Sequence, residues 1–160
     1  MTHVICALTC GRVEETRRTW EHNLSGNHHP LLWWDNTEDA AEREAIAEIA
    51  RQYEKKTAFQ VGKNMGIAYP LNMMMQFAFE VLHADAVTTM ANDILEPAGW
   101  IEKRSAYLER IPGAGIVSIP FDTPGCARYP RKGENGLVYE EGDIIGNFTI
   151  SRAVWEAIGG

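Results

Sequence analysis

The sequence has few cysteines and no long apolar run. Its three cysteines, Cys6, Cys10 and Cys126, are too few and too scattered to suggest a disulfide framework or a zinc site. They are expected to stay reduced, which predicts a cytoplasmic location. No apolar run is long enough to cross a bilayer, so no membrane span is expected. The first residues carry no charged leader and no cleavage site, and they read as a strand rather than a signal peptide.

Excess positive charge and two common nucleotide-binding motifs are also missing. The net charge of -7 argues against a general surface for nucleic acid or anionic membranes, but it leaves room for one small basic pocket. No G-x-G-x-x-G follows the first apolar run, which weakens a dehydrogenase-type dinucleotide fold. No G-x-x-x-x-G-K-[ST] is present either, which argues against a P-loop enzyme.

What the chain does contain is an alternation of short apolar runs with amphipathic segments. Strands are expected at 3–9, 31–34, 57–61, 87–90, 115–120 and 144–150, with helices between most of them. This order predicts an α/β fold with a mostly parallel central sheet and helices on both faces. The segment 121–142 is richer in turn residues and predicts a small hairpin or loop region. With 45% hydrophobic residues, 1–160 is expected to be one domain.

Several helix starts can be predicted from single residues. Thr37 and Ser151 are suitable N-caps, and Pro70 and Pro97 suit the first turn of a helix. The helix after Pro97 is expected to turn a stripe that includes Arg104 toward the core. Trp33, Trp34 and Trp155 could support self-association if they are exposed, but a position in the core is the favoured interpretation.

Polar side chains follow each of the first four predicted strands. They are Thr9 and Arg12, Asp35 and Asn36, Lys63 and Asn64, and Asn92 and Asp93. Because the carboxyl ends of parallel strands share one edge of the sheet, these groups should face a common crevice. One aspartate in such a place is commonly a helix cap, whereas four successive polar strand ends favour a nucleotide site.

The residue types suggest how such a site would divide its tasks. Asp35 or Asn36 could hydrogen-bond a base edge, and Arg12 or Lys63 could neutralise phosphate charge. Asp93 could hold Mn²⁺ or Mg²⁺ while a diphosphate supplies most of the other ligands. The plainer alternative is that Asp93 caps a helix and that the two cations are solvated surface residues.

The same residues resemble the family 2 glycosyltransferases, inverting enzymes with the Rossmann-like GT-A fold. The first strand with Thr9 and Arg12 resembles their opening strand and loop, and LLWWDN resembles the strand whose carboxylate recognises the nucleobase. The run from Lys63 to Gly66, with Asn72 beyond it, is similar to their N-x-G…N segment. The most specific match is TTMANDILEPAGW, which resembles the D-x-D strand and loop.

This resemblance implies a nucleotide-sugar donor, commonly linked to UDP, with Mn²⁺ or Mg²⁺ on its diphosphate. Asp93 takes the place of the metal-binding aspartate, and Ala91 stands where the motif usually has its first aspartate. The donor site implied by the resemblance comprises Thr9, Arg12, Asp35, Asn36, Lys63, Asn64, Gly66, Asn92 and Asp93. The acceptor, a sugar, lipid or protein, is not specified.

The catalytic base cannot be assigned. In the family it usually comes from a segment that would follow Gly160, so the expected domain lacks the usual C-terminal acceptor side. Glu140, Glu141 and Asp143 are nearest in order but are more typical of a solvated turn.

Three functions are therefore open: a transferase, a nucleotide-sugar-binding module with at most donor hydrolysis, and a nucleotidyltransferase of related layout. The last predicts a first loop richer in Gly, Arg and Lys than Cys10-Gly11-Arg12. Dimerisation would be one way for so short a chain to complete its fold.

Overall fold

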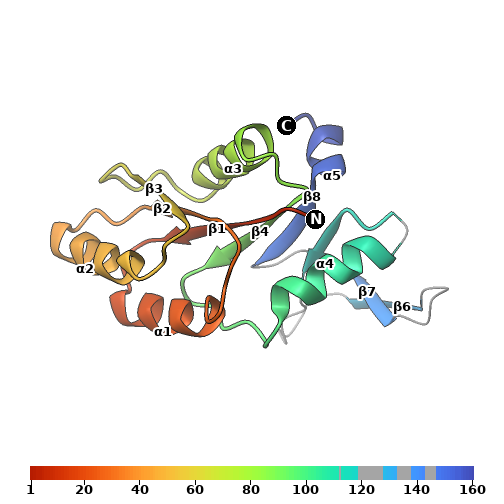
Figure 1. Ribbon diagram of the computed structural model, residues 1–160, viewed down its shortest axis with the longest axis horizontal. Helices are drawn as coiled ribbons and strands as arrows, with labels where there is room; N and C mark the ends of the chain where they lie inside the picture. Colours follow the sequence, from red (N-terminus) through yellow and green to blue (C-terminus); the bar gives the residue numbers. More distant parts are fainter. Residues whose placement is uncertain (112, 119–127, 133–137, 143–146) are drawn as a thin grey trace.

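The central feature of the computed structural model is a six-stranded sheet with the strand order β3-β2-β1-β4-β8-β5 (Figure 1). The structure describes residues 1–111, 113–118, 128–132, 138–142 and 147–160, of which 128–132 and 138–142 by backbone only. The strands of the sheet are β1 (His3–Thr9), β2 (Leu31–Asp35), β3 (Lys56–Gln60), β4 (Ala86–Ala91), β5 (Ile116–Ser118) and β8 (Phe148–Ser151).

The first four strands run parallel to one another, and β8, which lies between β4 and β5, runs in the opposite direction. β1 pairs in parallel with both β2 and β4, and β2 pairs in parallel with β3. β8 runs antiparallel to β4 and to β5. The predicted α/β fold with a mostly parallel sheet is confirmed, and the carboxyl ends of four neighbouring strands do lie at one edge.

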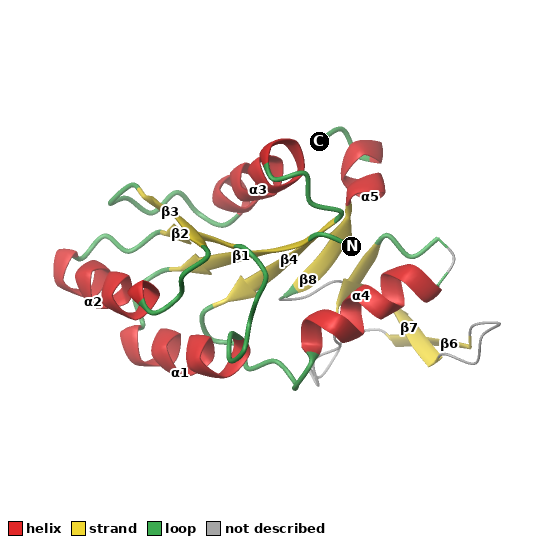
Figure 2. Cartoon of the chain, in the orientation of Figure 1, coloured by secondary structure: helices red, strands yellow, loops and turns green. Residues whose placement is uncertain are grey.

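Helices cover both faces of the sheet, as Figures 1 and 2 show. They are α1 (Val13–Asn23), α2 (Ala40–Arg51), α3 (Ala68–Gln76), α4 (Trp100–Arg110) and α5 (Arg152–Ala157), with a π-helical turn, η1 (Phe77–Val81), continuing α3. α1, α2 and α4 lie on one face and α3 and α5 on the other. None of the helices in the described part of the chain is long and apolar enough to cross a membrane.

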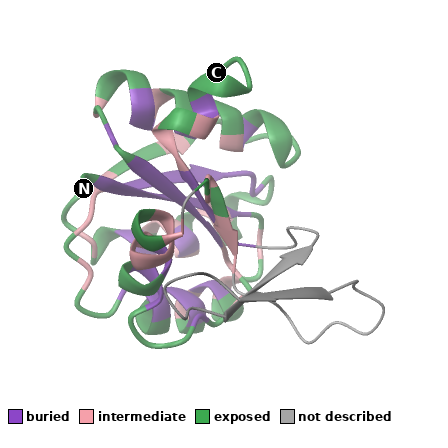
Figure 3. Ribbon diagram, turned by 90° about the vertical axis from the view of Figure 1, so that its right-hand side faces the viewer, coloured by how far each residue is buried: buried purple, intermediate pink, exposed green. Residues whose placement is uncertain are grey.

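The alternation of side chains along β1 and β2 divides the core into two layers. Ile5 and Trp33 pack with Trp20 under α1 and α2, whereas Cys6 and Trp34 pack on the side of α3 and α5. Both faces are therefore buried, as parallel strands require (Figure 3). The three tryptophans Trp33, Trp34 and Trp155 are all buried, which confirms their predicted core position.

Two predicted helix starts are wrong. α2 is capped by Asp39, whose carboxylate accepts from Glu42 N, because the Thr37 hydroxyl is bonded to Asp35 instead. α4 begins at Trp100 rather than at Pro97, after Gly99 in the left-handed region with φ 67°. The prediction for Ser151 is confirmed, since its hydroxyl accepts from Val154 N.

The segment predicted as a loop or hairpin contains a separate antiparallel pair. β6 (Arg128–Lys132) pairs with β7 (Val138–Gly142), and neither belongs to the main sheet. Within the described residues, β5 begins at Ile116, one residue after the expected start, and β8 runs from Phe148 to Ser151, one residue past the expected end. The remainder of both predictions lies outside the described residues.

Candidate functional site

The loop between β1 and α1 lies at the centre of the predicted crevice. Gly11 and Arg12 both have left-handed backbone angles, with φ 60° and 54°. The Gly11 N–H donates to Thr37 Oγ1 at 2.8 Å, and its carbonyl accepts from Asn92 Nδ2 at 3.3 Å. One short turn thus ties the end of β1 to the loops that follow β2 and β4.

Asp35 is a fully buried carboxylate with an uneven pattern of hydrogen bonds. Its Oδ1 accepts from Thr9 Oγ1 at 3.0 Å, from Thr37 N at 3.0 Å and from Thr37 Oγ1 at 2.6 Å. The Thr9 hydroxyl in turn accepts from Trp33 Nε1 at 2.8 Å. Asp35 Oδ2 has no hydrogen-bond partner among the described residues, although it is buried. A buried acceptor without a partner costs free energy, so this oxygen is ready for a donor.

Asn36 holds the loop after β3 against the end of β2. Its Nδ2 donates to the Gly66 carbonyl at 2.6 Å, and its Oδ1 accepts from Met65 N at 3.1 Å. The Asn64 side chain stabilises the same turn by accepting from Gly66 N at 2.9 Å. Because these bonds occupy both ends of the Asn36 amide, its role is to fix the loop. The structure therefore separates it from Asp35, which keeps an unused oxygen.

The loop after β4 contains Asn92 and the expected metal ligand Asp93. Asn92 Nδ2 donates to Thr16 Oγ1 at 2.9 Å, so its amide points toward the β1–α1 loop. Asp93 Oδ2 forms an ion pair with Arg12 Nη1 at 2.6 Å. Both partners of this pair are solvent-exposed, at 60% for the Arg12 side chain and 43% for that of Asp93. Arg12 and Asp93 are thus brought together, as the crevice prediction requires.

The sequence reasoning missed a buried polar network that carries the β4–α4 loop. Asn147, on the segment leading into β8, accepts from Ala91 N at 2.7 Å and donates to Glu96 Oε1 at 2.7 Å. Glu96 also accepts from Arg104 Nη2 through both carboxylate oxygens, at 2.8 and 2.9 Å. All three side chains are at most 4% exposed. The only signal was the expected inward position of Arg104, which gave no indication of its partners.

Of the nine predicted site residues, Lys63 is the one that does not join the others. It lies on the exposed loop after β3, and that strand ends three residues earlier, at Gln60. The other eight interact through the three loops described above. Asn64 also reaches the β1–α1 loop, since its Nδ2 lies 3.7 Å from Cys10 Sγ.

Asp93 is the carboxylate of the site that the metal prediction assigns to a cation. No group of three or more His, Cys, Asp or Glu side chains that could hold a metal occurs in the described part of the chain. A hard oxygen ligand such as Asp93 suits Mg²⁺ or Mn²⁺ only if phosphate and water supply the remaining ligands. The side chains of Glu140, Glu141 and Asp143, the nearest candidates for a base, lie outside the described residues.

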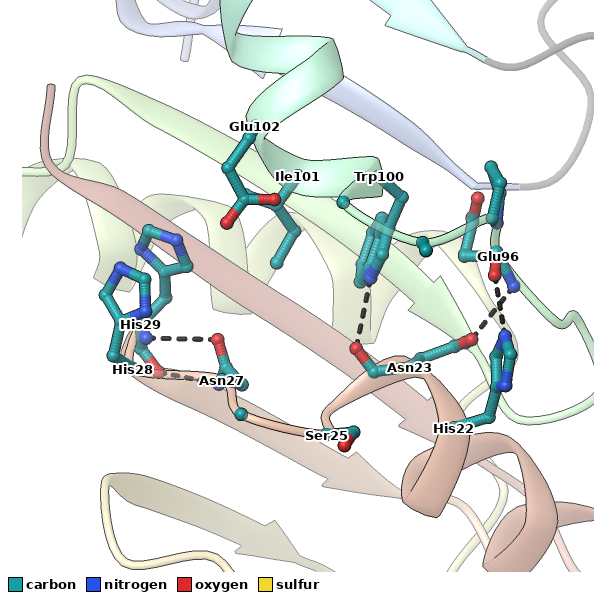
Figure 4. A pocket seen from close by; sticks show the side chains of 14 residues that line it. His22, Asn23, Ser25, Asn27, His28, His29, Glu96, Trp100, Ile101 and Glu102 are labelled. Carbon is teal, nitrogen blue, oxygen red and sulfur yellow. Dashed lines mark hydrogen bonds between the residues drawn. The ribbon is translucent and has the colours of Figure 1, made fainter.

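A separate cavity of about 290 Å³ lies between the end of α1 and the start of α4 (Figure 4). It is lined by residues of 22–29 and 96–102, including His22, His28, His29 and Glu102. Figure 4 shows the bonds that close one end of it, from Trp100 Nε1 to the Asn23 carbonyl and from Glu96 N to Asn23 Oδ1. None of the nine predicted site residues lines this cavity.

Several solved structures are similar to this fold. One is a mannosyltransferase from Pyrobaculum calidifontis in complex with GDP-Man and Mn²⁺, with TM-score 0.62 and 16% identity over 99% of this chain. Another is S. aureus TarS 1-349, with TM-score 0.60 and 11% identity over 99% of the chain. The chain spans 47% and 49% of the lengths of these two structures.

A third similar structure extends the comparison beyond glycosyl transfer. It is a 4-diphosphocytidyl-2C-methyl-D-erythritol synthase from Anaerococcus prevotii, with TM-score 0.63 and 8% identity over 98% of this chain and 72% of that one. No protein-family model matches the sequence, and the search of curated proteins finds no match. At such low identities the comparisons establish the fold, which is the α/β fold shared by GT-A glycosyltransferases and nucleotidyltransferases.

Proposed function

We propose that this chain binds a nucleotide-sugar, most simply a UDP-sugar, and acts as a metal-dependent inverting glycosyltransferase. The observation that carries the proposal is Asp35 at the end of β2. Its Oδ1 is fixed by three hydrogen bonds, and its buried Oδ2 has no partner among the described residues. The ring N–H of a nucleobase is a donor that would satisfy this oxygen.

The diphosphate would lie between the β1–α1 and β4–α4 loops. Arg12 supplies a guanidinium, whose planar set of N–H donors matches phosphate oxygens. Asp93 supplies the carboxylate for Mn²⁺ or Mg²⁺, and such a cation acts as a Lewis acid on the departing diphosphate. Asn92 does not replace the carboxylate lost at Ala91, because its amide is bonded to Gly11 and Thr16.

The reaction would be a direct displacement at the anomeric carbon. The acceptor oxygen forms a bond to that carbon while the bond to the diphosphate oxygen breaks, and the nucleoside diphosphate leaves. The acceptor hydroxyl gives its proton to a base, which stays unassigned in this chain. Arg12 would stabilise the negative charge that develops on the leaving diphosphate.

Calorimetric titration with UDP, GDP and their sugar conjugates, with and without Mn²⁺, tests the donor site. We expect Asp35→Asn to weaken nucleotide binding roughly tenfold to a hundredfold, because it places an N–H₂ or a neutral oxygen where a charged acceptor is needed. Asp93→Ala should remove the effect of Mn²⁺. Asp85→Asn, at the opposite edge of the sheet where it bonds Thr2 N, is the matched control and should bind normally. Failure of every nucleotide to bind would contradict the proposal.

The similar synthase structure supports a nucleotidyltransferase as the second candidate. The two reactions release different products, so they can be separated by incubation. A glycosyltransferase releases a nucleoside diphosphate from a nucleotide-sugar. A nucleotidyltransferase instead joins a nucleoside triphosphate to a phosphorylated substrate, and pyrophosphate leaves from the triphosphate. Slow donor hydrolysis without a transfer product would instead support a binding module.

A further inference from the structure

The carboxylate available to a cation at the strand ends already has a positively charged partner. Arg12 Nη1 lies 2.6 Å from Asp93 Oδ2, so the guanidinium occupies one of the two carboxylate oxygens and places a positive charge beside the other. No second carboxylate stands two residues earlier, where Ala91 is found. A cation that binds Asp93 in the free protein must therefore either displace Arg12 or bind against its positive charge.

The backbone on both sides of this pair is held in place. Arg12 adopts the left-handed conformation, with φ 54° and ψ 56°, which is uncommon for a residue with a Cβ. Gly11, the residue before it, is bonded to Thr37 through its N–H and to Asn92 through its carbonyl. On the other side, Asn147 holds Ala91 N. Partner exchange at Asp93 is thus left to the long Arg12 side chain.

The pair is also weak enough to exchange. Its two side chains are 60% and 43% exposed, and exposed ion pairs contribute little because water and salt screen them. A diphosphate offers the guanidinium a better partner, with more negative charge and a geometry that allows paired hydrogen bonds. Once Arg12 turns to the phosphate, Asp93 is free to bind a cation that the same diphosphate also coordinates.

We propose that Arg12 and the divalent cation are alternative partners of Asp93, and that a bound nucleoside diphosphate transfers Asp93 from the first to the second. This inference rests on the proposed donor site. It makes cation binding dependent on the nucleotide: the free protein holds Mn²⁺ poorly, and Arg12 sets part of the coupling between the two ligands. Such coupling is reciprocal, so it can be measured from either side.

The test compares Arg12→Gly with the unchanged protein. Glycine accepts the left-handed backbone without strain, so the fold should be preserved. We expect Arg12→Gly to bind Mn²⁺ alone roughly twofold to fivefold more tightly, the range set by an exposed ion pair. The factor by which UDP or GDP raises Mn²⁺ affinity should fall by the same amount. Paramagnetic broadening of the Asp93 amide resonance reports Mn²⁺ binding even when it is weak.

Arg17→Gln is the matched control. Arg17 lies on α1, in the second turn after Arg12, and pairs with Glu14, so the variant removes one positive charge near the start of α1 without touching Asp93. It should leave Mn²⁺ affinity and coupling unchanged. A loss of coupling in both variants would mean that only the net charge of α1 matters, which overturns the inference. Unchanged or weaker Mn²⁺ binding in Arg12→Gly, or none at all, overturns it as well.

The outcomes separate this inference from the proposed function. If no nucleotide binds to any variant, the proposed function fails, while the Mn²⁺ titration without nucleotide still decides whether Arg12 competes for Asp93. If nucleotide binding depends on Asp35 but Arg12→Gly leaves the coupling between nucleotide and Mn²⁺ intact, the proposed donor site stands. The proposed exchange of partners at Asp93 is then wrong.

Discussion

His3, the first residue of β1, is a buried histidine that the proposed chemistry does not use. It is 3% exposed, its Nδ1 lies 3.0 Å from Ser105 Oγ, and its Nε2 is bonded to Thr88 Oγ1. Burial lowers the pKa of His3 from 6.5 to about 4, and the nearby positive charges of His29 and Arg104 act in the same direction. The side chain is therefore neutral in the folded protein at neutral pH.

This pKa predicts a loss of stability in mild acid. Between pH 6.5 and about 4 the unfolded chain binds a proton at His3 that the folded chain does not. The free energy of unfolding therefore decreases as the pH is lowered through this range. The full shift corresponds to about 3 kcal/mol, and below pH 4 His3 contributes no further loss. Urea unfolding at several pH values should show a smaller loss in His3→Gln than in the unchanged protein.

A matched control for this prediction is His83→Asn, since His83 is exposed and its left-handed backbone suits asparagine. It should leave the acid dependence as it is. Identical pH profiles for His3→Gln and the unchanged protein would contradict the buried neutral histidine.

Single residues also mark how far the candidate site could be predicted. Asp35 and Asp93 follow directly from their place after buried strands, because a parallel sheet brings such ends together. The role of Thr37 could not be predicted, because its hydroxyl can either cap a helix or bond to Asp35, and the sequence does not decide between the two. The position of Lys63 depended on the end of an edge strand: β3 ends at Gln60, and Lys63 lies on the exposed loop that follows.

At the scale of elements, the network of Glu96, Arg104 and Asn147 joins three parts of the chain. It connects the β4–α4 loop to α4 and to the segment before β8, and it also holds Ala91 N beside the candidate metal ligand. Burial lowers the pKa of Arg104, while the Glu96 carboxylate opposes that effect. The guanidinium lies 5.0 Å from the centre of the Trp100 ring, which covers part of it.

Breaking this network should be costly. Glu96→Ala leaves the Arg104 charge buried without its partner, which typically costs about 3–5 kcal/mol. Glu44→Ala is the control, because it removes an ion pair with Arg51 that is exposed, and such pairs contribute less than about 1 kcal/mol. Denaturant unfolding of both variants measures the difference. Equal losses of stability would show that the Glu96 pair contributes no more than a surface pair.

Elements were predicted best where the apolar pattern was strong. The first four strands lie within one residue of their predicted bounds at either end. For β1 and β2 the reason is that a strand buried on both faces is mostly apolar. The predicted start of α4 was wrong because proline is as compatible with a loop as with the first turn of a helix. The helix begins only after Gly99, whose left-handed backbone redirects the chain. The reversed direction of β8 has no signal in sequence, since it is a short apolar run like the others.

At the scale of the whole molecule, the class of fold could be predicted but the order of strands could not. Alternating strands and helices indicate a parallel sheet, yet the position of β8 between β4 and β5 depends on pairing over long stretches of chain. The polar ends of four predicted parallel strands gave the expected crevice, and the structure links eight of the nine predicted residues through the loops at that edge. The buried network could not be predicted because its members are spread over 96–147 without a motif.

The central position of β1 has a consequence for synthesis on the ribosome. β1 pairs on one side with β2, which follows it closely in sequence. On the other side it pairs with β4, in which Ala86 lies opposite His3. A growing chain must therefore expose one edge of an apolar strand until about eighty further residues have emerged. We expect stalled nascent chains ending before β4 to be cleaved readily by added protease, and protection to appear only after β8 has emerged. Protection of the shorter chains would mean that β1 to β3 fold before the central pairing exists.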